Sequence, residues 1–370
     1  MVGIHRNRPV LFVMPSDRLG GAETILKIVM RTLATRVQRI EVVFISHKAE
    51  GNWEDLPENI HTHTIPSATE KGGLIPAARL IKKLCRMAPF QATFSSHSHV
   101  NAYLGLLRKA GTLKTDRLIV RESSVTFDRY KGGFGRFMEL LYRTGYPAAD
   151  LVIAQTDYMR ERLLDYLPPA RGWNLRTIHS PFDVERVREL EQAEVPPLTD
   201  RPYVVSAGRL ERVKAFDQLI RAFAQLPAEE DLALVILGEG SERKMLEELA
   251  KELGLRDRVI LPGFVSNPIP YFREARLCAA SSRIEGFSNV ILQMMSQHAA
   301  IATTLATPDY GRLPGVFTCP PGNPEALAGI MSQALRLSAE EQAQNRRQFA
   351  AYLAERSPEK FIEAAWKASE

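Results

Sequence analysis

Short apolar runs rich in β-branched residues alternate with amphipathic stretches through most of the chain. Strands buried on both faces of a sheet are apolar throughout, whereas a surface helix buries one stripe with a period of about 3.6 residues. The first half contains predicted strands at Val10–Met14, Glu41–Ser46, Ala92–Ser96, Leu118–Arg121 and Leu151–Gln155. The second half contains predicted strands at Tyr203–Ala207, Ala233–Leu237, Val259–Leu261, Leu277–Ala280 and Ile301–Thr303. Such alternation is typical of parallel sheets covered by helices.

A polar segment separates the two series of strands. Residues 180–202 are charged and contain four prolines, which predicts an interdomain linker. A chain of 370 residues exceeds the usual size of a single core. We therefore expect an α/β protein of two doubly wound, Rossmann-like domains that face a central cleft. The expected N-terminal domain covers residues 1–184, and the expected C-terminal domain covers 185–356, with a final helix over 357–370 that packs back on the first domain.

Composition sets the broad class of protein. Apolar residues make up 45% of the chain and charged residues 25%, as in an ordinary globular protein. The three cysteines, Cys85, Cys278 and Cys319, have no metal-like spacing and cannot all pair, which favours a reduced, intracellular protein. Pro15 and Asp17 interrupt the N-terminal apolar run, unlike a signal peptide, and no run approaches the roughly 18 apolar residues of a membrane span. We expect a cytoplasmic protein, at most peripheral on the inner face of the cell membrane.

The net charge of +5 is unevenly distributed. Residues 1–185 carry 26 Lys and Arg against 18 Asp and Glu, whereas the remainder carries 22 against 25. A basic N-terminal half favours an anionic partner such as a membrane surface, a pyrophosphate or a nucleic acid.

The first candidate ligand loop follows the first predicted strand. Gly20 and Gly21 precede a helical run over Thr24–Thr35. Paired glycines let the backbone approach a ligand closely, and a helix N-terminus offers N–H groups to an anion. A tight strand–helix turn explains the same residues without a ligand.

The second candidate loop follows strand Tyr203–Ala207 and begins at Gly208. Arg209 and Lys214 can converge there on one anion. A guanidinium suits bidentate phosphate contact, and an ammonium adds a compact charge. Since no metal motif is visible, the pair is predicted to stabilise a leaving pyrophosphate. Two solvated surface cations are the alternative.

The third candidate loop follows strand Leu277–Ala280. Ser288 or Asn289 is predicted to begin a helix, with Glu285 in the loop before it and Gln293 about one turn inside. Carboxylate and amide groups suit a hydroxyl-rich ligand. A capped core helix is the alternative, and its apolar face is predicted to hold Val290, Ile291, Met294 and Met295.

This ordered series of motifs resembles a known family. The run GRLERVKAFDQLIRAF and the stretch from LVILGEG to EGFSNVILQMM look like the donor domain of retaining family 4 glycosyltransferases with the GT-B fold. GGAE, SHSH and PPGNPEALAGIM also match. The resemblance covers nearly the whole chain and is strongest over residues 203–296. It implies a nucleotide-sugar donor, with no metal ion and no cofactor besides this substrate.

The resemblance also implies roles for individual residues. Arg209 and Lys214 match the pair that contacts the donor pyrophosphate, and Glu285 matches the first acid of a Glu-x7-Glu motif that contacts the donor sugar. Phe264 and Val265 match the segment that frames the base. Backbone amides that hold sugar and phosphate are expected at Gly286, Phe287, Ser288 and Asn289. The loop at Gly20 and Gly21 is expected to reach the phosphate and the reacting centre.

Two histidines end the predicted strand ATFSSHSH. Alternation along a strand puts His97 and His99 on one face, at the edge where an open sheet collects site residues, although lone histidines are often structural. The family has a histidine in such a strand near the donor sugar. The resemblance therefore implies that His99, or as second choice His97, contacts a sugar hydroxyl or the transition state.

The chain departs from the family pattern at several positions. Gln293 replaces the second acid of the motif, where an amide can still bond ribose hydroxyls with a loss of roughly 1 kcal/mol. Ser180 replaces the common asparagine before Pro181, and His298 begins a run that lacks the usual glycine and proline. The segment 303–317 is shorter than usual and lacks an expected acid. These departures point to an unusual donor or to reduced activity, and a silent homologue is a minor alternative.

Two segments of the basic half suggest contact with anionic lipid, on which basic amphipathic helices with aromatic residues can lie. Leu74–Arg86 combines an apolar stripe with cations, and a packed crossover helix is the preferred interpretation there. Phe127–Phe137 interleaves aromatic rings with cations, for which membrane or lipid-acceptor contact is preferred. No nucleic-acid motif appears.

The sequence therefore predicts a retaining, metal-independent hexosyltransferase. It would use a UDP- or GDP-sugar and a glycan or lipid-linked acceptor in the synthesis of cell-surface polysaccharide, O-antigen or lipopolysaccharide. A catalytically silent glycan-binding or sugar-nucleotide-binding homologue is one alternative. A dinucleotide-dependent oxidoreductase is another, although no G-x-G-x-x-G with a following acid comes after the first strand.

Overall fold

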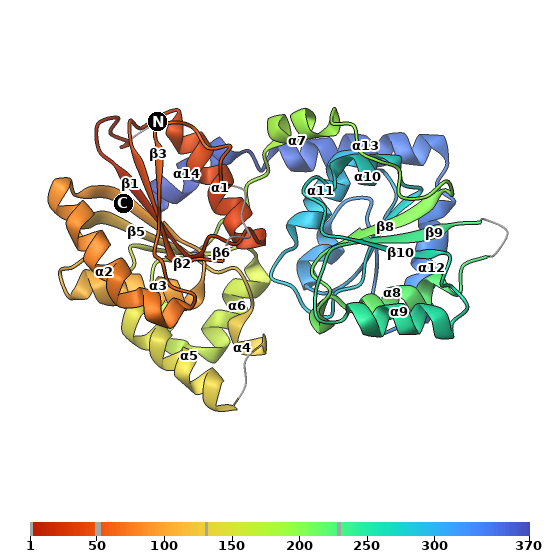
Figure 1. The fold of residues 1–370 in the computed structure, drawn as a ribbon, viewed down its shortest axis with the longest axis horizontal. Helices are drawn as coiled ribbons and strands as arrows, with labels where there is room; N and C mark the ends of the chain where they lie inside the picture. The colour runs from red at the N-terminus through yellow and green to blue at the C-terminus, as the bar shows by residue number, and fades with distance from the viewer. Residues whose placement is uncertain (1–2, 49–52, 130–131, 228–230) are drawn as a thin grey trace. The chain divides into compact units, whose positions relative to one another are not determined.

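The computed structural model describes residues 3–48, 53–129, 132–227 and 231–370. Its contacts divide the chain into two compact units (Figure 1). Unit 1 comprises Met1–Phe182 and Arg356–Glu370, and unit 2 comprises Asp183–Glu355. Each unit is a parallel sheet covered by helices, so the predicted fold class of two doubly wound domains is confirmed.

Unit 1 contains a seven-stranded sheet of order β3-β2-β1-β4-β5-β6-β7. Its strands are β1 Val10–Ser16, β2 Ile40–Ser46, β3 Ile60–Thr64, β4 Phe90–Ser95, β5 Thr115–Arg121, β6 Leu151–Ala154 and β7 Leu175–Thr177. The order reverses between β1 and β4, so the loops after these two strands leave the sheet side by side.

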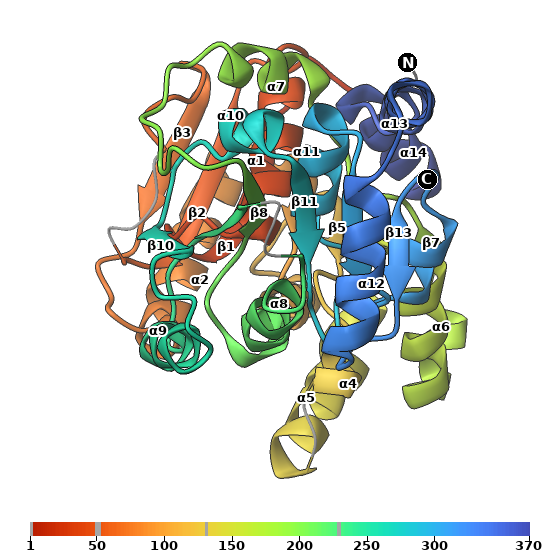
Figure 2. The same cartoon turned by 90° about the vertical axis from the view of Figure 1, so that its right-hand side faces the viewer.

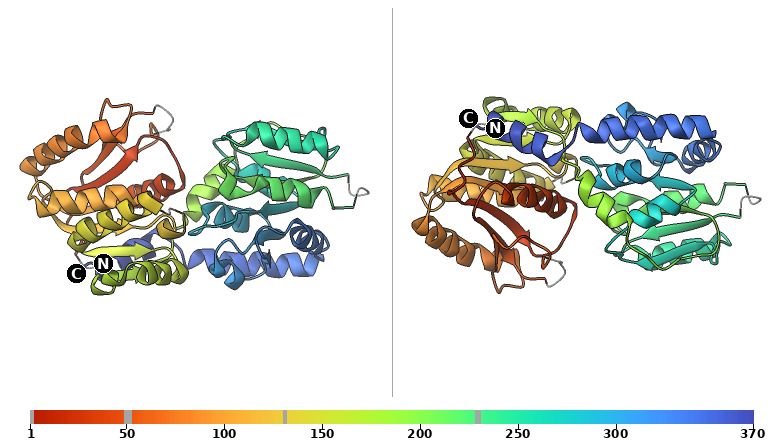
Figure 3. Two further views of the ribbon diagram at one scale, coloured as in Figure 1. Left: turned by 90° about the horizontal axis from the view of Figure 1, so that it is seen from below. Right: turned by 90° about the horizontal axis from the view of Figure 1, so that it is seen from above.

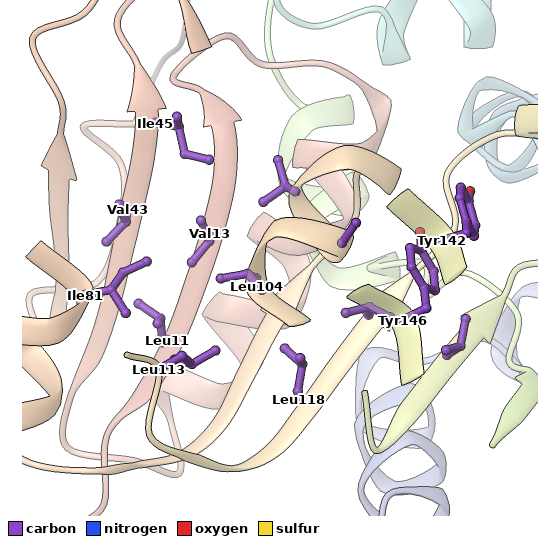
Figure 4. Close-up of a cluster of buried hydrophobic side chains, with 14 of the residues drawn as sticks. Leu11, Val13, Val43, Ile45, Ile81, Leu104, Leu113, Leu118, Tyr142 and Tyr146 are labelled. Atoms are coloured by element: carbon purple, nitrogen blue, oxygen red, sulfur yellow. The ribbon is translucent and has the colours of Figure 1, made fainter. Parts of the chain in front are cut away.

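Helices cover both faces of this sheet. They are α1 Gly21–Ala34, α2 Glu70–Met87, α3 Ser98–Lys109, α4 Thr126–Arg129, α5 Gly132–Gly145, α6 Asp157–Tyr166 and the C-terminal α14 Pro358–Ala368. One core holds apolar side chains of α1 and α14, and the other those of α2, α3, α5 and α6. Figure 4 shows Val13, Val43 and Ile81 of the second core between the sheet and α2. The C-terminal helix therefore belongs to the first unit.

Unit 2 contains a six-stranded parallel sheet of order β10-β9-β8-β11-β12-β13. Its strands are β8 Tyr203–Ala207, β9 Ala233–Leu237, β10 Val259–Gly263, β11 Leu277–Ala280, β12 Ile301–Thr304 and β13 Phe317–Cys319. The order reverses between β8 and β11, which pair directly. This second reversal again places two loops next to each other at the carboxyl edge.

The helices of unit 2 are α7 Val184–Glu191, α8 Phe216–Phe223, α9 Arg243–Glu252, α10 Ile269–Glu274, α11 Asn289–Gln297, α12 Pro324–Leu335 and α13 Ala339–Ala354. Helices α8, α9 and α12 share one core on one face of the sheet. Helices α7, α10, α11 and α13 lie on the other face (Figures 1 and 2).

The ten predicted strands are all present, each within a few residues of its predicted bounds. Three further strands were missed, namely β3, β7 and β13. The linker prediction for residues 180–202 is wrong in part, because α7 forms within it and packs against α10 and α11. In α11, Leu292 is buried and Val290 is only half-buried, so the predicted apolar face is corrected at one position. Among the described residues, no helix is both long and apolar enough to cross a bilayer.

Candidate functional site

The predicted site residues of unit 2 lie in the loops after β8 and β11, the two strands at which the sheet order reverses. Ligands of doubly wound sheets bind at such a reversal, beyond the carboxyl ends of the strands. Gly208, Arg209 and Lys214 belong to the first loop. Glu285 and the start of α11 belong to the second loop. The topology therefore brings together two motifs that are far apart in the sequence, since Lys214 and Glu285 are separated by 71 residues.

Lys214 and Glu285 form the direct link between these loops. Lys214 Nζ lies 2.6 Å from Glu285 Oε1, and each side chain is less than one-fifth exposed. Ser282 Oγ donates to the same carboxylate oxygen at 2.8 Å. A second set of bonds joins the backbones, since Ser281 Oγ donates to the Lys214 carbonyl and Arg283 N–H to the Val213 carbonyl, at 2.9 and 2.8 Å. The ammonium and the carboxylate are therefore held in place before any ligand binds.

The backbone directly after Lys214 is strained. Ala215 has φ 51° and ψ 42°, the left-handed region that non-glycine residues seldom occupy. Such a conformation costs about 1–3 kcal/mol and persists only where the surroundings enforce it. Here the loop bonds on either side of Lys214 supply the constraint.

A row of glycines lets the loops after β8, β9 and β10 pack backbone against backbone. Gly208 N–H donates to the Leu237 carbonyl, and Gly238 N–H donates to the Gly263 carbonyl. Gly238 has φ 150°, and a Cβ there would lie 1.9 Å from the Gly208 carbonyl oxygen. Gly238 was not among the predicted site residues. The GEG run after the predicted strand Ala233–Leu237 was the available signal.

Tyr310 contacts the loop that contains Glu285. Like Gly238, it was not among the predicted site residues. Its hydroxyl accepts the Ser288 N–H at 2.9 Å, and its ring packs edge-on against Phe287 with centroids 5.4 Å apart. The side chain is buried, and burial together with the Glu285 charge holds the pKa of the Tyr310 hydroxyl well above its usual value. The Glu285 N–H is taken by the Ala306 carbonyl at 2.9 Å. The short segment 303–317 thus braces the loop, a role that no local sequence pattern indicates.

The other predicted residues of unit 2 range from exposed to buried. Arg209 pairs with Glu211 at 2.6 Å, and its side chain is 54% exposed. Phe264 follows Gly263 at the end of β10 and is 73% exposed, while Val265 beside it is half-buried. Gln293 is half-buried in α11, and its side-chain amide has no hydrogen-bond partner among the described residues. In the loop, Gly286 and Phe287 are buried, and Ser288 and Asn289 are half-buried.

In unit 1 the glycine loop follows β1 and faces the end of β4, again where the sheet order reverses. The Gly20 N–H donates to Glu23 Oε2 at 3.1 Å, and Gly21 begins α1. Glu23 Oε1 lies 3.1 Å from His97 Nε2. Burial opposes ionisation of Glu23, but the hydrogen bond and charge of His97 outweigh it and hold the pKa of this carboxyl below its usual value. Glu23 therefore accepts the Gly20 N–H at the start of α1 and also faces His97.

The placement of the two histidines on a strand is wrong. Strand β4 ends at Ser95, His97 is the residue before α3, and His99 lies in its first turn. The two side chains diverge to different partners, because His97 meets Glu23 of α1 whereas His99 Nε2 lies 2.7 Å from Glu70 Oε2 of α2. His97 is thus the histidine beside the glycine loop.

Comparison with known proteins agrees with this architecture. A family model described as glycosyl transferases group 1 matches residues 187–352, and one described as Glycosyltransferase Family 4 matches residues 19–186. An N-acetylgalactosaminyltransferase of Campylobacter jejuni that acts on a diphospho-undecaprenol-linked sugar is 30% identical over 295 residues, which cover 77% of each chain. The chain belongs to this glycosyltransferase family.

Further relatives of this glycosyltransferase agree with that assignment. The lipopolysaccharide core biosynthesis glycosyltransferase LpsE of Rhizobium meliloti is 31% identical over 187 residues, 49% of this chain and 53% of its own. Among solved structures, sucrose-phosphate synthase from Thermosynechococcus elongatus matches with a TM-score of 0.80 at 16% identity, over 98% of each chain. Anabaena HepE in complex with UDP-glucose matches with a TM-score of 0.77 at 19% identity, over 97% of this chain and 98% of its own. These structural matches show a GT-B fold.

Proposed function

We propose that this glycosyltransferase moves a hexosyl unit from a UDP- or GDP-sugar to a glycan or lipid-linked acceptor, with retention of the anomeric configuration and without a metal ion. Its place would be the synthesis of cell-surface polysaccharide, O-antigen or lipopolysaccharide. The Lys214–Glu285 pair is the observation that carries this proposal, because it holds an ammonium and a carboxylate 2.6 Å apart where the order of the unit 2 sheet reverses. The C. jejuni relative acts on a lipid-diphosphate-linked sugar, which supports a similar acceptor.

In the proposed reaction the bond between the anomeric carbon and the diphosphate oxygen breaks, and the nucleoside diphosphate leaves with the electron pair. The acceptor oxygen bonds to the anomeric carbon, and its proton passes to the leaving diphosphate. Lys214 and Arg209 would stabilise the charge that develops on the diphosphate, since prearranged cations act most strongly where charge appears in the transition state. Glu285 would accept hydrogen bonds from the hydroxyls of the sugar.

The remaining donor contacts are assigned by their positions. Phe264 would stack on the base, because its exposed ring stands at the edge of the sheet. Gln293, with its half-buried amide, would face the ribose, and Val265 would line the base. The loop amides from Gly286 to Asn289 would bind sugar and phosphate oxygens at the start of α11.

Between the two histidines we now favour His97 for contact with the sugar. Its partner Glu23 also accepts the Gly20 N–H, so His97 is tied to the loop that includes Gly20 and Gly21. His99 is directed to α2 instead. Replacing His97 with Gln should lower turnover more than the same change at His99, and equal turnover in both variants would contradict this preference.

The proposed function is tested by incubating the protein with UDP-, GDP- and ADP-sugars and measuring nucleotide release with and without lipid-linked acceptors. We expect release from a UDP- or GDP-sugar, no loss of activity with a chelator, and a product whose anomeric configuration by NMR equals that of the donor. Binding without turnover would indicate the silent homologue. An inverted product would refute retention, and binding of NADPH but of no nucleotide sugar would refute the proposal.

A further inference from the structure

Three helices form one outer surface of unit 1. Helices α2, α3 and α5 share a core beneath them, and α3 packs against α5 (Figures 1 and 3). Helices α2 and α3 are joined by a hydrogen bond, in which Tyr103 Oη on α3 donates to the Leu74 carbonyl on α2 at 2.7 Å. We call the solvent side of this layer the α2–α3–α5 face. The buried side chains of α2 confirm the interpretation of Leu74–Arg86 as a packed crossover helix. The exposed side chains of the α2–α3–α5 face are basic or apolar.

The α2–α3–α5 face is strongly basic. The three helices contain nine Lys and Arg, five on α2, two on α3 and two on α5, against two Glu. Both acids already have partners, since Glu70 pairs with His99 and Glu139 with Arg143, and one of the cations, Arg108 of α3, pairs with Asp150 outside these helices. Among the described residues, no salt bridge neutralises the α2 cations, which are Lys71, Arg79, Lys82, Lys83 and Arg86. These three helices therefore carry a larger net positive charge than the +5 of the whole chain.

Large apolar side chains are also exposed on α5 and α2. On α5, Phe134, Phe137 and Leu140 are 54%, 51% and 57% exposed, and their spacing of three residues puts them along one side of the helix. On α2, Ile75 and Met87 are 66% and 67% exposed. Single exposed apolar residues are common, but several of them along one side of a helix mark an interaction surface. Tyr130 and Lys131 of the same predicted segment lie outside the described residues.

We propose that the α2–α3–α5 face docks on an anionic lipid bilayer. Phosphate head groups would meet the α2 cations, while the α5 side chains enter the boundary between head groups and acyl chains. A nucleic acid would satisfy the cations, but it offers no apolar layer for Leu140, Ile75 and Met87. This inference rests on the proposed function, because an enzyme that takes a lipid-linked acceptor must reach it at the bilayer surface.

The test is co-sedimentation of the full chain with vesicles of phosphatidylcholine alone or with phosphatidylglycerol added. We expect binding that requires phosphatidylglycerol and weakens with salt. A first variant changes the α2 cations Arg79, Lys82, Lys83 and Arg86 to Gln. Since each cation near an anionic surface contributes about fivefold in affinity, this variant should bind at least ~50-fold more weakly. A second variant, Phe137→Ser with Leu140→Ser, should also bind more weakly.

The matched control removes the same charge from unit 2, by changing the exposed residues Lys244, Lys251, Arg346 and Arg347 to Gln. It should bind vesicles as the wild type does, and thermal unfolding should show that all variants fold. Equal binding by the control and the α2 variant, or equal binding to neutral and anionic vesicles, would overturn the proposal. So would RNA binding that depends on the α2 cations while vesicle binding does not.

Nucleotide-sugar hydrolysis in the absence of lipid separates this inference from the proposed function. The α2 variant should hydrolyse the donor in solution at the wild-type rate, because its changes lie in unit 1 whereas the donor loops belong to unit 2. Vesicle binding by a wild type that turns over no nucleotide sugar would refute the proposed function and leave the docking surface standing.

Discussion

Replacement of Lys214 by Met tests the centre of the proposed donor site. Methionine keeps most of the apolar stem and removes the ammonium that lies 2.6 Å from Glu285. A prearranged cation or donor at a developing negative charge is worth about 10²–10³ in kcat, or about 2.7–4 kcal/mol, so we expect a loss of that size. Turnover is measured as nucleotide release from the preferred donor under saturating conditions.

The same change should also destabilise unit 2. Glu285 would keep one hydrogen bond, from Ser282, and would lose its partner of opposite charge. A hydrogen bond between charged groups contributes about 1.5–3 kcal/mol, and partial exposure of this pair reduces the expected loss to about 1–2 kcal/mol. Urea unfolding, followed by a probe in unit 2, measures this loss. The double variant Lys214→Met with Glu285→Gln should recover part of the stability but none of the turnover.

Arg209→Met is the matched comparison, because Arg209 is more than half exposed and pairs with Glu211 at the surface. Exposed pairs contribute about 0–1 kcal/mol, so its stability should hardly change while its turnover falls. Lys244→Met, on the exposed side of α9, should change neither quantity. Full turnover in the Lys214 variant would refute the assigned role. A stability loss no larger than that of the Arg209 variant would show that the pair does not brace the loops.

Three further changes probe the surroundings of the site. Tyr310→Phe removes the acceptor of the Ser288 N–H and keeps the ring, so KM for the donor should rise several-fold with little change in Tm; an unchanged KM would contradict the bracing role. Ser180→Ala removes a hydroxyl that accepts from buried Arg121 at 2.7 Å, in a setting where burial lowers the pKa of the guanidinium to about 9. Unfolding free energy should fall by about 1–3 kcal/mol, and a change below ~0.5 would rule this out. Gln293→Glu should keep or raise turnover if this side chain faces ribose, and complete loss would show that the site is built differently.

The local pattern of apolar residues was sufficient for the central strands of both sheets. Runs such as those of β1 and β9 are buried on both faces and are apolar throughout, so their pattern is unambiguous. The edge strand β3 was missed because most of Ile60–Thr64 faces solvent and carries polar side chains. Strands β7 and β13 have only three residues each, which is too short for a periodic signal. Helix α7 was hidden in a charged, proline-rich segment, where packing against α10 and α11 stabilises it.

In the candidate site, too, the position of each loop could be predicted from the sequence, but the contacts between loops could not. Arg209, Lys214 and Glu285 were found because each lies in a loop directly after a predicted strand, and strand ends are visible in the sequence. That Lys214 meets Glu285 could not be derived from either loop, because it depends on β8 and β11 being neighbours. The histidines were misplaced because the end of β4 depends on its pairing with β5. The last β4 residue that pairs with β5 is Ser95.

By itself, the sequence determined the succession of strands and helices, the two-domain α/β class and the loops that carry polar chemistry. These properties depend on burial and backbone preference, which act over a few residues. The tertiary structure alone decided which loops meet, that Tyr310 braces the Glu285 loop, that His97 meets Glu23, and which described cations of α2 stay unneutralised. Contacts of this kind arise from the order of strands in a sheet and the packing of helices upon it, and therefore join residues whose spacing along the chain has no period to detect.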